Sequence, residues 1–152
     1  MNWITAKKWD EERPIMKIFL AKFFFILIPL FSFRAIAQMP DTHYVNAIAY
    51  VAGGIGSEES TAIEMESRQW PLMLQFSQVD EKGWGVWISD IQVKIINSKN
   101  QEIFSAICDG PMMLINLAPG QYDVLGTYEG RAHKRPILIE ANKPQKLSIF
   151  WK

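Results

Sequence analysis

Apolar and polar residues alternate in short runs along the chain from Pro71 onward. In the first run, Leu72, Leu74 and Phe76 face one way while Gln75 and Ser77 face the other. A period of two is typical of a β-strand with one buried face. Further short strand runs cover residues 86–88, 91–95, 103–108, 122–128, 133–139 and 146–151, and residues 112–117 form an apolar run. About seven short strands, with turn signals roughly every eight to twelve residues, predict a mainly β, antiparallel, Ig-like sandwich over residues 71–152.

Glycine and proline mark the turns of this predicted sandwich, because they supply backbone angles that end one strand and start the next. The pattern around the run Met112 to Leu117 is turn, short strand, turn, strand. The positions that we expect to define the fold are Gly53, Gly54, Gly56, Asp109, Gly110, Pro111, Pro119, Gly120, Tyr122 and Gly130.

A leader with one short strand and then an accessory helix precede the sandwich. Residues 38–52 contain the alternating stretch His43 to Val51, which predicts a single strand, and residues 53–70 form a glycine turn and a helix. We expect Ser57 to cap the helix and the acidic residues Glu58 and Glu59 to stabilise its first turn. The helix should end at about Gln69, before Pro71. Its apolar face is thin, so we expect it across one edge or end of a sheet rather than inside a core.

The first 37 residues read as an extension followed by a cleavable signal peptide. Met16 opens a basic segment, an apolar run covers 23–33, and Ala35-Ile36-Ala37 matches the small-residue pattern before a cleavage site. We expect cleavage between Ala37 and Gln38, and either Met1 or Met16 as the true start. The predicted location is periplasmic or secreted, with the membrane contacted only transiently through the signal peptide.

The charge balance and the cysteine content exclude some classes of partner and of reactive site. After residue 37 the chain carries ten basic and thirteen acidic side chains, which argues against a nucleic-acid partner. Cys108 is the only cysteine. Its position in an apolar strand pattern favours a small core residue over a reactive thiol.

Four segments of the chain resemble a known family: Ile91-Gln92-Val93-Lys94-Ile95, Asp109-Gly110-Pro111, Leu117-Ala118-Pro119-Gly120-Gln121-Tyr122-Asp123-Val124 and Tyr128-Glu129-Gly130. They are similar to the carboxypeptidase regulatory-like domains, a transthyretin-like (prealbumin-like) β-sandwich family, in a small exported bacterial form. The resemblance covers roughly residues 50–152 and implies a non-catalytic accessory module that binds or packs against another molecule. The chain ends in Ile149-Phe150-Trp151-Lys152 and lacks the Tyr-Arg-Gly-Ser tail of the transthyretin-like hydrolases. The hydrolase activity is therefore not implied.

No stretch predicts a catalytic, metal or cofactor site. The glycine turn at residues 53–56 lacks the Lys-Ser/Thr pair of a phosphate-binding loop. After residue 37 the only histidines, His43 and His133, lack the spacing of zinc ligands. His133 and its basic neighbours are expected to form a solvated strand edge. A hydrolase is the least favoured function.

Trp84 and Trp87 are the candidate partner-binding residues. In a strand they would point to opposite faces, so at most one is core and the other is at the surface or an edge, unless Gly85 introduces a bulge. Packing of a tryptophan under the loop or against the helix that carries Trp70 is equally compatible with the sequence. Exposed tryptophan suits protein interfaces and also stacks on sugar rings. We expect an exported binding or structural module of the cell envelope whose partner is an envelope protein, with a carbohydrate-binding module as the alternative.

Overall fold

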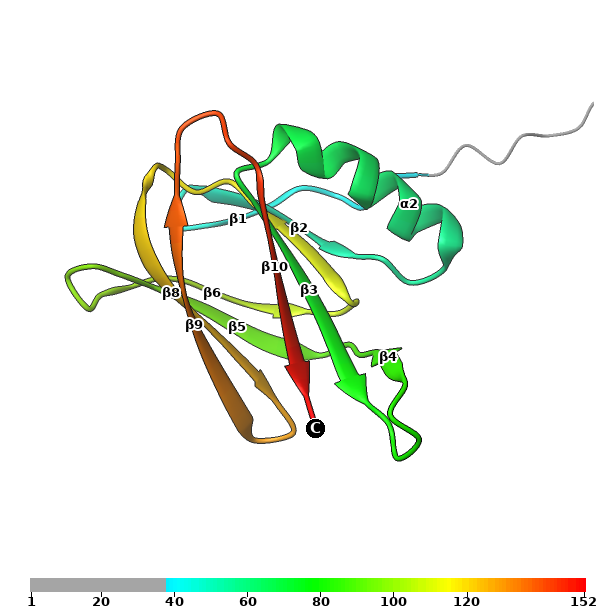
Figure 1. The fold of residues 1–152 in the computed structure, drawn as a ribbon. Coiled ribbons are helices and arrows are strands. Elements are labelled where there is room, and N and C mark those ends of the chain that lie inside the picture. Colours follow the sequence, from blue (N-terminus) through cyan, green and yellow to red (C-terminus); the bar gives the residue numbers. More distant parts are fainter. Residues whose placement is uncertain (1–37) are drawn as a thin grey trace, which may run out of the picture. The chain divides into compact units, whose positions relative to one another are not determined.

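The structure is a computed structural model that describes residues 38–152. The predicted signal peptide, Ala37 and the choice between Met1 and Met16 lie outside the described residues. Two sheets make up the described part (Figure 1), so the predicted β-sandwich class is confirmed.

The larger sheet has six strands in the order β1-β2-β7-β3-β10, with β4 paired to β3, and the smaller sheet has the order β6-β5-β8-β9. The strands are β1 (His43–Val45), β2 (Ile48–Gly53), β3 (Leu72–Val79), β4 (Gly85–Trp87), β5 (Ile91–Asn97), β6 (Glu102–Cys108), β7 (Met112–Ile115), β8 (Gly120–Tyr128), β9 (Arg131–Ile139) and β10 (Gln145–Trp151). The described residues form ten strands: eight lie within residues 71–152, where about seven were predicted, and two lie in the leader, where one was predicted. The pairing is antiparallel except between β3 and β10, which are parallel.

The stretch predicted as one strand, His43 to Val51, is a hairpin. Asn46 and Ala47 both have positive φ angles, 50° and 65°, and join β1 to β2. Two such residues match the tight turn that suits the twist of a hairpin. Alternation continues across this turn, which is why the sequence pattern alone did not reveal it.

A main core fills the space between the sheets. The inner residues of β3, Leu72, Leu74 and Phe76, are fully buried there with Trp151 of β10. β3 and β7 differ from the other strands, because Leu72 to Phe76 and Met112 to Ile115 are buried without interruption. Strands of this kind have an apolar layer on both faces.

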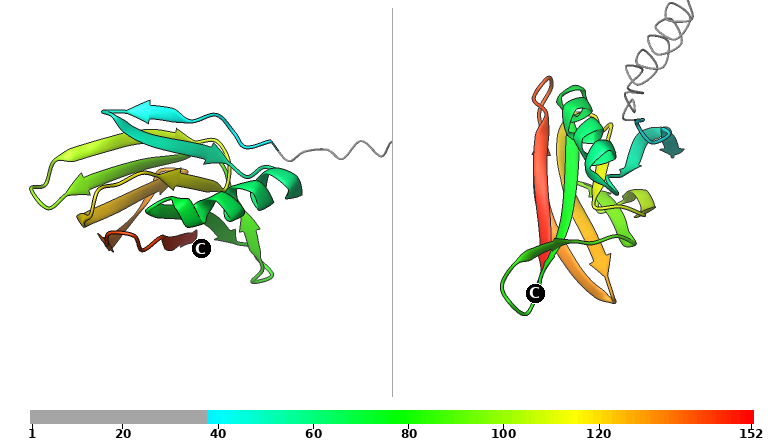
Figure 2. Two further views of the ribbon diagram at one scale, coloured as in Figure 1. Left: turned by 90° about the horizontal axis from the view of Figure 1, so that it is seen from above. Right: turned by 90° about the vertical axis from the view of Figure 1, so that its right-hand side faces the viewer.

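Helix α2 (Ser57–Glu66), extended by the 3-10 turn η2 (Ser67–Gln69), supplies the second layer. Ile63 is fully buried in a second cluster on the outer face of the larger sheet. The other buried members of this cluster are Val51, Met73, Met112 and Leu114. Figures 1 and 2 show the helix against this sheet. The helix was expected across one edge or end of a sheet; it packs on the outer face of the larger sheet and, as its thin apolar face suggests, buries a single residue, Ile63.

The glycine turn before the helix is confirmed, but the predicted cap is not. Gly56 occupies the capping position, no side chain caps the helix, and Ser57 is its first residue. Glu59 instead reaches back, and its Oε1 accepts a hydrogen bond of 2.6 Å from the amide of Gly54. This contact ties the end of β2 to the first turn of the helix.

The two central turns carry the chain between the sheets. Asp109-Gly110-Pro111 joins β6 of the smaller sheet to β7 of the larger one, and residues 116–119 lead back to β8. Tyr122 Oη donates a hydrogen bond of 3.0 Å to the carbonyl of Ala118, which closes the second turn. Such a tyrosine bond to upstream backbone is familiar from β-sandwich corners.

Gly110→Ala should destabilise the fold by about 1–3 kcal/mol, since a Cβ there would lie 2.1 Å from the carbonyl oxygen of Gly53 and would push β2 away from the turn. Gly85→Ala is the matched control, because a Cβ at Gly85 meets no atom within 4 Å. Urea unfolding of both variants measures the difference. Equal midpoints for the two variants would contradict the close approach of Gly110 to Gly53.

Candidate functional site

Both candidate tryptophans are at the surface. Trp84 is 71% exposed and Trp87 is 56% exposed, so neither belongs to the core or packs under the helix. Val86 between them is 49% exposed. Exposed large apolar side chains in one short segment are informative, because monomeric proteins rarely present them together without a binding role.

Strand register places a further aromatic residue on the face that carries Trp87. Ser77 of β3 pairs with Trp87 on one side and with Phe150 of β10 on the other. Directly paired residues point to the same face of a sheet. Trp87 and Phe150, which is 45% exposed, therefore flank the small Ser77 side chain on the outer face. We call Trp84, Val86, Trp87 and Phe150 the β4 surface. Val86 pairs with Gln78 and so points to the opposite face of the sheet from Trp87 and Phe150, which places exposed apolar side chains on both faces of β4.

Helix α2 does not extend over this row. Its Glu64 accepts a hydrogen bond of 3.4 Å from Gln75 Nε2 and forms an ion pair of 3.7 Å with Lys146. Gln75 comes before Ser77 on β3, and Lys146 comes before Phe150 on β10; Gln75 pairs with Ser148, and Lys146 pairs with Met73. The apolar cover of the outer face thus stops before the Phe150-Ser77-Trp87 row.

The loop before β4 is held by Asp80. Its carboxylate Oδ1 accepts hydrogen bonds from the amides of Lys82, at 2.9 Å, and Trp84, at 2.7 Å. The amide of Asp80 donates to the carbonyl of Trp84 at 2.8 Å. Gly83, with a φ of 83°, makes the turn possible. Trp84 is exposed on an organised loop, which lowers the entropy cost of binding through it.

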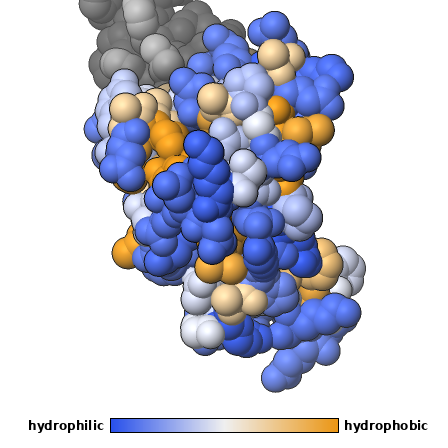
Figure 3. Space-filling model, turned by 90° about the vertical axis from the view of Figure 1, so that its left-hand side faces the viewer, coloured by the Kyte–Doolittle hydropathy of each residue, from blue (hydrophilic) through white to orange (hydrophobic). Residues whose placement is uncertain are grey.

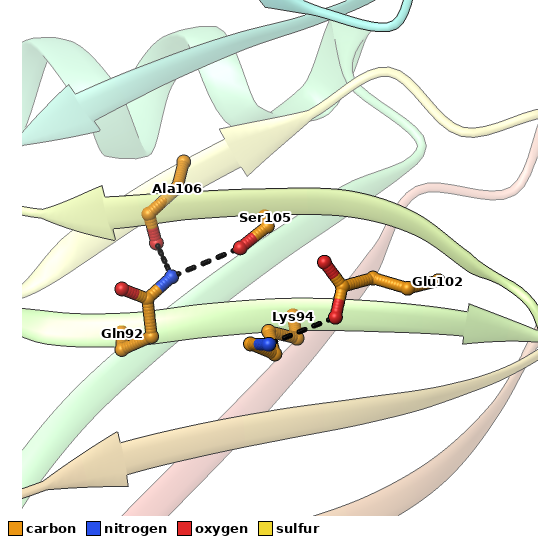
Figure 4. Close-up of polar contacts among 5 residues, drawn as sticks. All are labelled: Gln92, Lys94, Glu102, Ser105 and Ala106. Carbon is orange, nitrogen blue, oxygen red and sulfur yellow. Dashed lines mark hydrogen bonds and ion pairs between the residues drawn. The ribbon is translucent and has the colours of Figure 1, made fainter.

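The outer face of the smaller sheet has a different character. Gln92 Nε2 donates to Ser105 Oγ at 3.1 Å and to the carbonyl of Ala106 at 3.2 Å, and Lys94 pairs with Glu102 at 2.9 Å (Figure 4). The side view in Figure 3 is mostly hydrophilic, with hydrophobic residues in small separate patches. Rows of paired polar side chains of this kind are typical of a sheet face that is in contact with water.

The two histidines of the described residues pack against aromatic rings. His43 packs against Tyr50, with ring centroids 5.5 Å apart, and His133 packs against Trp151 at 5.1 Å. Next to His133, Lys134 pairs with Asp123 at 2.8 Å. Among residues 38–152, no group of three or more His, Cys, Asp or Glu side chains is placed to hold a metal ion. Within the same residues, no helix has the length and apolar character needed to cross a bilayer.

Cys108 is fully buried in the main core, as its strand pattern predicted. Its thiol lies 3.1 Å from the carbonyl oxygen of Gly110 and 3.2 Å from that of Met112, so its single S–H can donate to either. Burial raises the pKa of Cys108 to about 12. The thiol is therefore protonated and shielded at neutral pH, which does not suit a nucleophile.

Sequence reasoning found Trp84 and Trp87 but missed Val86 and Phe150. The alternation in β10 placed Phe150 on the same face as Lys146 and Ser148. A phenylalanine on an otherwise polar face was the signal that could have added it. Its closeness to Trp87 depends on the pairing of β3 with both β4 and β10, which no local pattern encodes.

Comparisons with known proteins leave the family open. No family model and no curated protein matches the chain. One solved structure, "The Bacillus anthracis TIE protein", aligns with a TM-score of 0.37 and 16% identity over 53% of this chain. The aligned part is 16% of that protein's chain, so this chain spans a small fraction of its length. A likeness this slight carries no argument about function.

The Cys108 thiol predicts a specific loss of stability at alkaline pH. An unfolded cysteine has a pKa of about 8.5, below the folded value of about 12. Between these values the folded state retains the proton that the unfolded state releases, so the free energy of unfolding falls as the pH rises through this window. Urea unfolding from about pH 8 to about pH 10 should therefore show a steeper decline for the parent than for Cys108→Ala. Parallel declines would contradict the raised pKa.

Proposed function

We propose that this chain is an exported, non-catalytic β-sandwich module of transthyretin-like type that binds another protein of the cell envelope through the β4 surface. The observation that carries the proposal is the exposure of Trp84, Val86 and Trp87 on one short strand and its loop. Tryptophan is enriched among the residues that dominate the energy of protein interfaces. Phe150 widens the apolar area on the outer face.

The free edge of β4 supports a protein partner. Among the described residues β4 pairs with β3 alone. Hydrogen-bonding groups alternate in direction along an antiparallel strand, and the amide of Ile88 and the carbonyl of Trp84 are directed at β3. By this alternation the backbone groups of Gly85 and Trp87 point away from it. An extended segment of a partner protein can add to such an edge while its side chains meet the tryptophans.

A glycan is the second candidate for the same surface. Indole rings also stack on sugar rings, and an open cleft of about 630 Å³ beside Val86 is lined by polar Gln78, Asp80 and Glu81. However, one carboxylate oxygen of Asp80 is already engaged by two amides of the loop. We therefore rank the glycan second, and a hydrolase last.

The test is crosslinked affinity capture from a cell-envelope extract with the parent chain and a Trp84→Ala, Trp87→Ala double variant. Both side chains are exposed, so the double variant should keep its fold, which circular dichroism and urea unfolding check. We expect one protein to be captured by the parent and lost with the variant. With that protein purified, the dissociation constant should rise by at least about tenfold, as for the loss of interface hot-spot residues.

The matched control is Ile107→Ala, Leu138→Ala. These residues are 61% and 50% exposed and lie on strands of the smaller sheet, away from the β4 surface. This control should capture and bind the same protein with unchanged affinity. Equal loss in both double variants, or retention in the tryptophan variant, would contradict the proposal.

A further inference from the structure

A second concave site lies at the opposite end of β3 from the β4 surface. Trp70 and Pro71 line it just before β3 begins, whereas β4 pairs with the last residues of β3. Three connections form its walls: η2 to β3, β7 to β8, and β9 to β10. They gather at the upper end of the sandwich in Figure 1. The cleft has a volume of about 770 Å³, within the range of small-molecule sites.

We propose that this cleft binds a short saccharide and that Trp70 is its stacking platform. Trp70 is half-buried; it packs against the second hydrophobic cluster and also lines the cleft. A ring fixed in this way is an ordered apolar plate beside polar groups. The apolar C–H face of a pyranose ring fits such a plate. This site is independent of the β4 surface and of the function proposed for it.

Two asparagines supply the hydrogen-bonding groups that a sugar needs. Asn116 and Asn142 are exposed and line the cleft from two different connections. Each carboxamide offers both a donor and an acceptor, a combination that matches a pair of neighbouring hydroxyl groups. Their backbones are fixed: the amide of Asn116 donates to the carbonyl of Ala49 at 2.9 Å, and Asn142 holds a φ of 58° in a tight turn.

Arg68 gives the cleft a preference for acidic sugars. Of the two basic side chains that line it, Lys143 is paired with Glu140, whereas Arg68 forms no ion pair with another residue of the described segment. A guanidinium binds a carboxylate through two parallel hydrogen bonds. A sugar that carries a carboxylate, a uronic acid, can therefore pair with Arg68. We expect a uronic-acid disaccharide to bind more tightly than its neutral counterpart.

Isothermal titration calorimetry with the full chain tests this assignment. The probes are matched neutral and uronic-acid disaccharides of glucose, galactose and mannose. We expect binding of at least one uronic-acid probe, weakened about three- to tenfold by Asn116→Ala and by Asn142→Ala, as for the loss of single hydrogen bonds. Arg68→Gln should remove the preference for the acidic probe without changing the affinity for the neutral one. These three exposed positions avoid the risk that a change at Trp70 unfolds the second cluster.

The Trp84→Ala, Trp87→Ala variant serves as the control and should bind the probes as the parent does. If no probe binds, the saccharide assignment is wrong, and the protein-capture result at the β4 surface is unaffected. If the probes bind but affinity is lost in the tryptophan variant and kept in Asn116→Ala and Asn142→Ala, the glycan site is the β4 surface instead. That outcome would overturn the assignment to Trp70.

Discussion

The burial of β3 and β7 on both faces is the constraint on which the rest of the structure depends. Leu74 of β3 faces the main core, and its neighbour Met73 faces the second cluster. The apolar side chains on both faces of these two adjacent strands are removed from water only if an apolar layer packs against each face. The smaller sheet supplies one layer, and α2, with Ile63, supplies the other. The glycine turn and the Glu59 contact to Gly54 bring the helix to that position.

The helix leaves part of the outer face uncovered, and this incomplete cover explains the candidate site. Glu64 of the helix contacts Gln75 and Lys146, which come before Ser77 and Phe150 along their strands. On the outer face of the smaller sheet, by contrast, polar side chains such as Gln92 form hydrogen bonds and ion pairs with neighbouring strands. A second molecule can bind at the Phe150-Ser77-Trp87 row and bury the apolar side chains that the helix leaves in contact with water. The β4 surface and the Trp70 cleft lie at opposite ends of β3, so both can be occupied at once.

Local patterns predicted the sandwich class, the turns and the helix bounds, because alternation, glycine and proline act over a few residues. They failed where the outcome depends on distant pairing. The β1–β2 turn at Asn46 continues the alternation, and the parallel pairing of β10 with β3 leaves no trace in either strand. The unbroken apolar run from Leu72 to Leu74 is a sequence signal for the burial of β3 on both faces. The sequence does not indicate which element covers the outer face. The sequence indicated Trp84 and Trp87 as candidate surface residues because they lie close together in one loop and strand. It did not indicate Phe150, whose position next to Trp87 depends on the pairing of distant strands.

Native-state amide hydrogen exchange tests the central claim about β3 and β7 most directly. The amides of Leu74 in β3 and Leu114 in β7 should exchange only through global unfolding and be among the slowest, because apolar layers cover both faces of these strands. The amide of Val86 in β4 should exchange much faster through local opening, since β4 pairs with one strand and is exposed. Slow exchange at Val86 matching that at Leu74, or fast exchange at Leu114, would contradict the account.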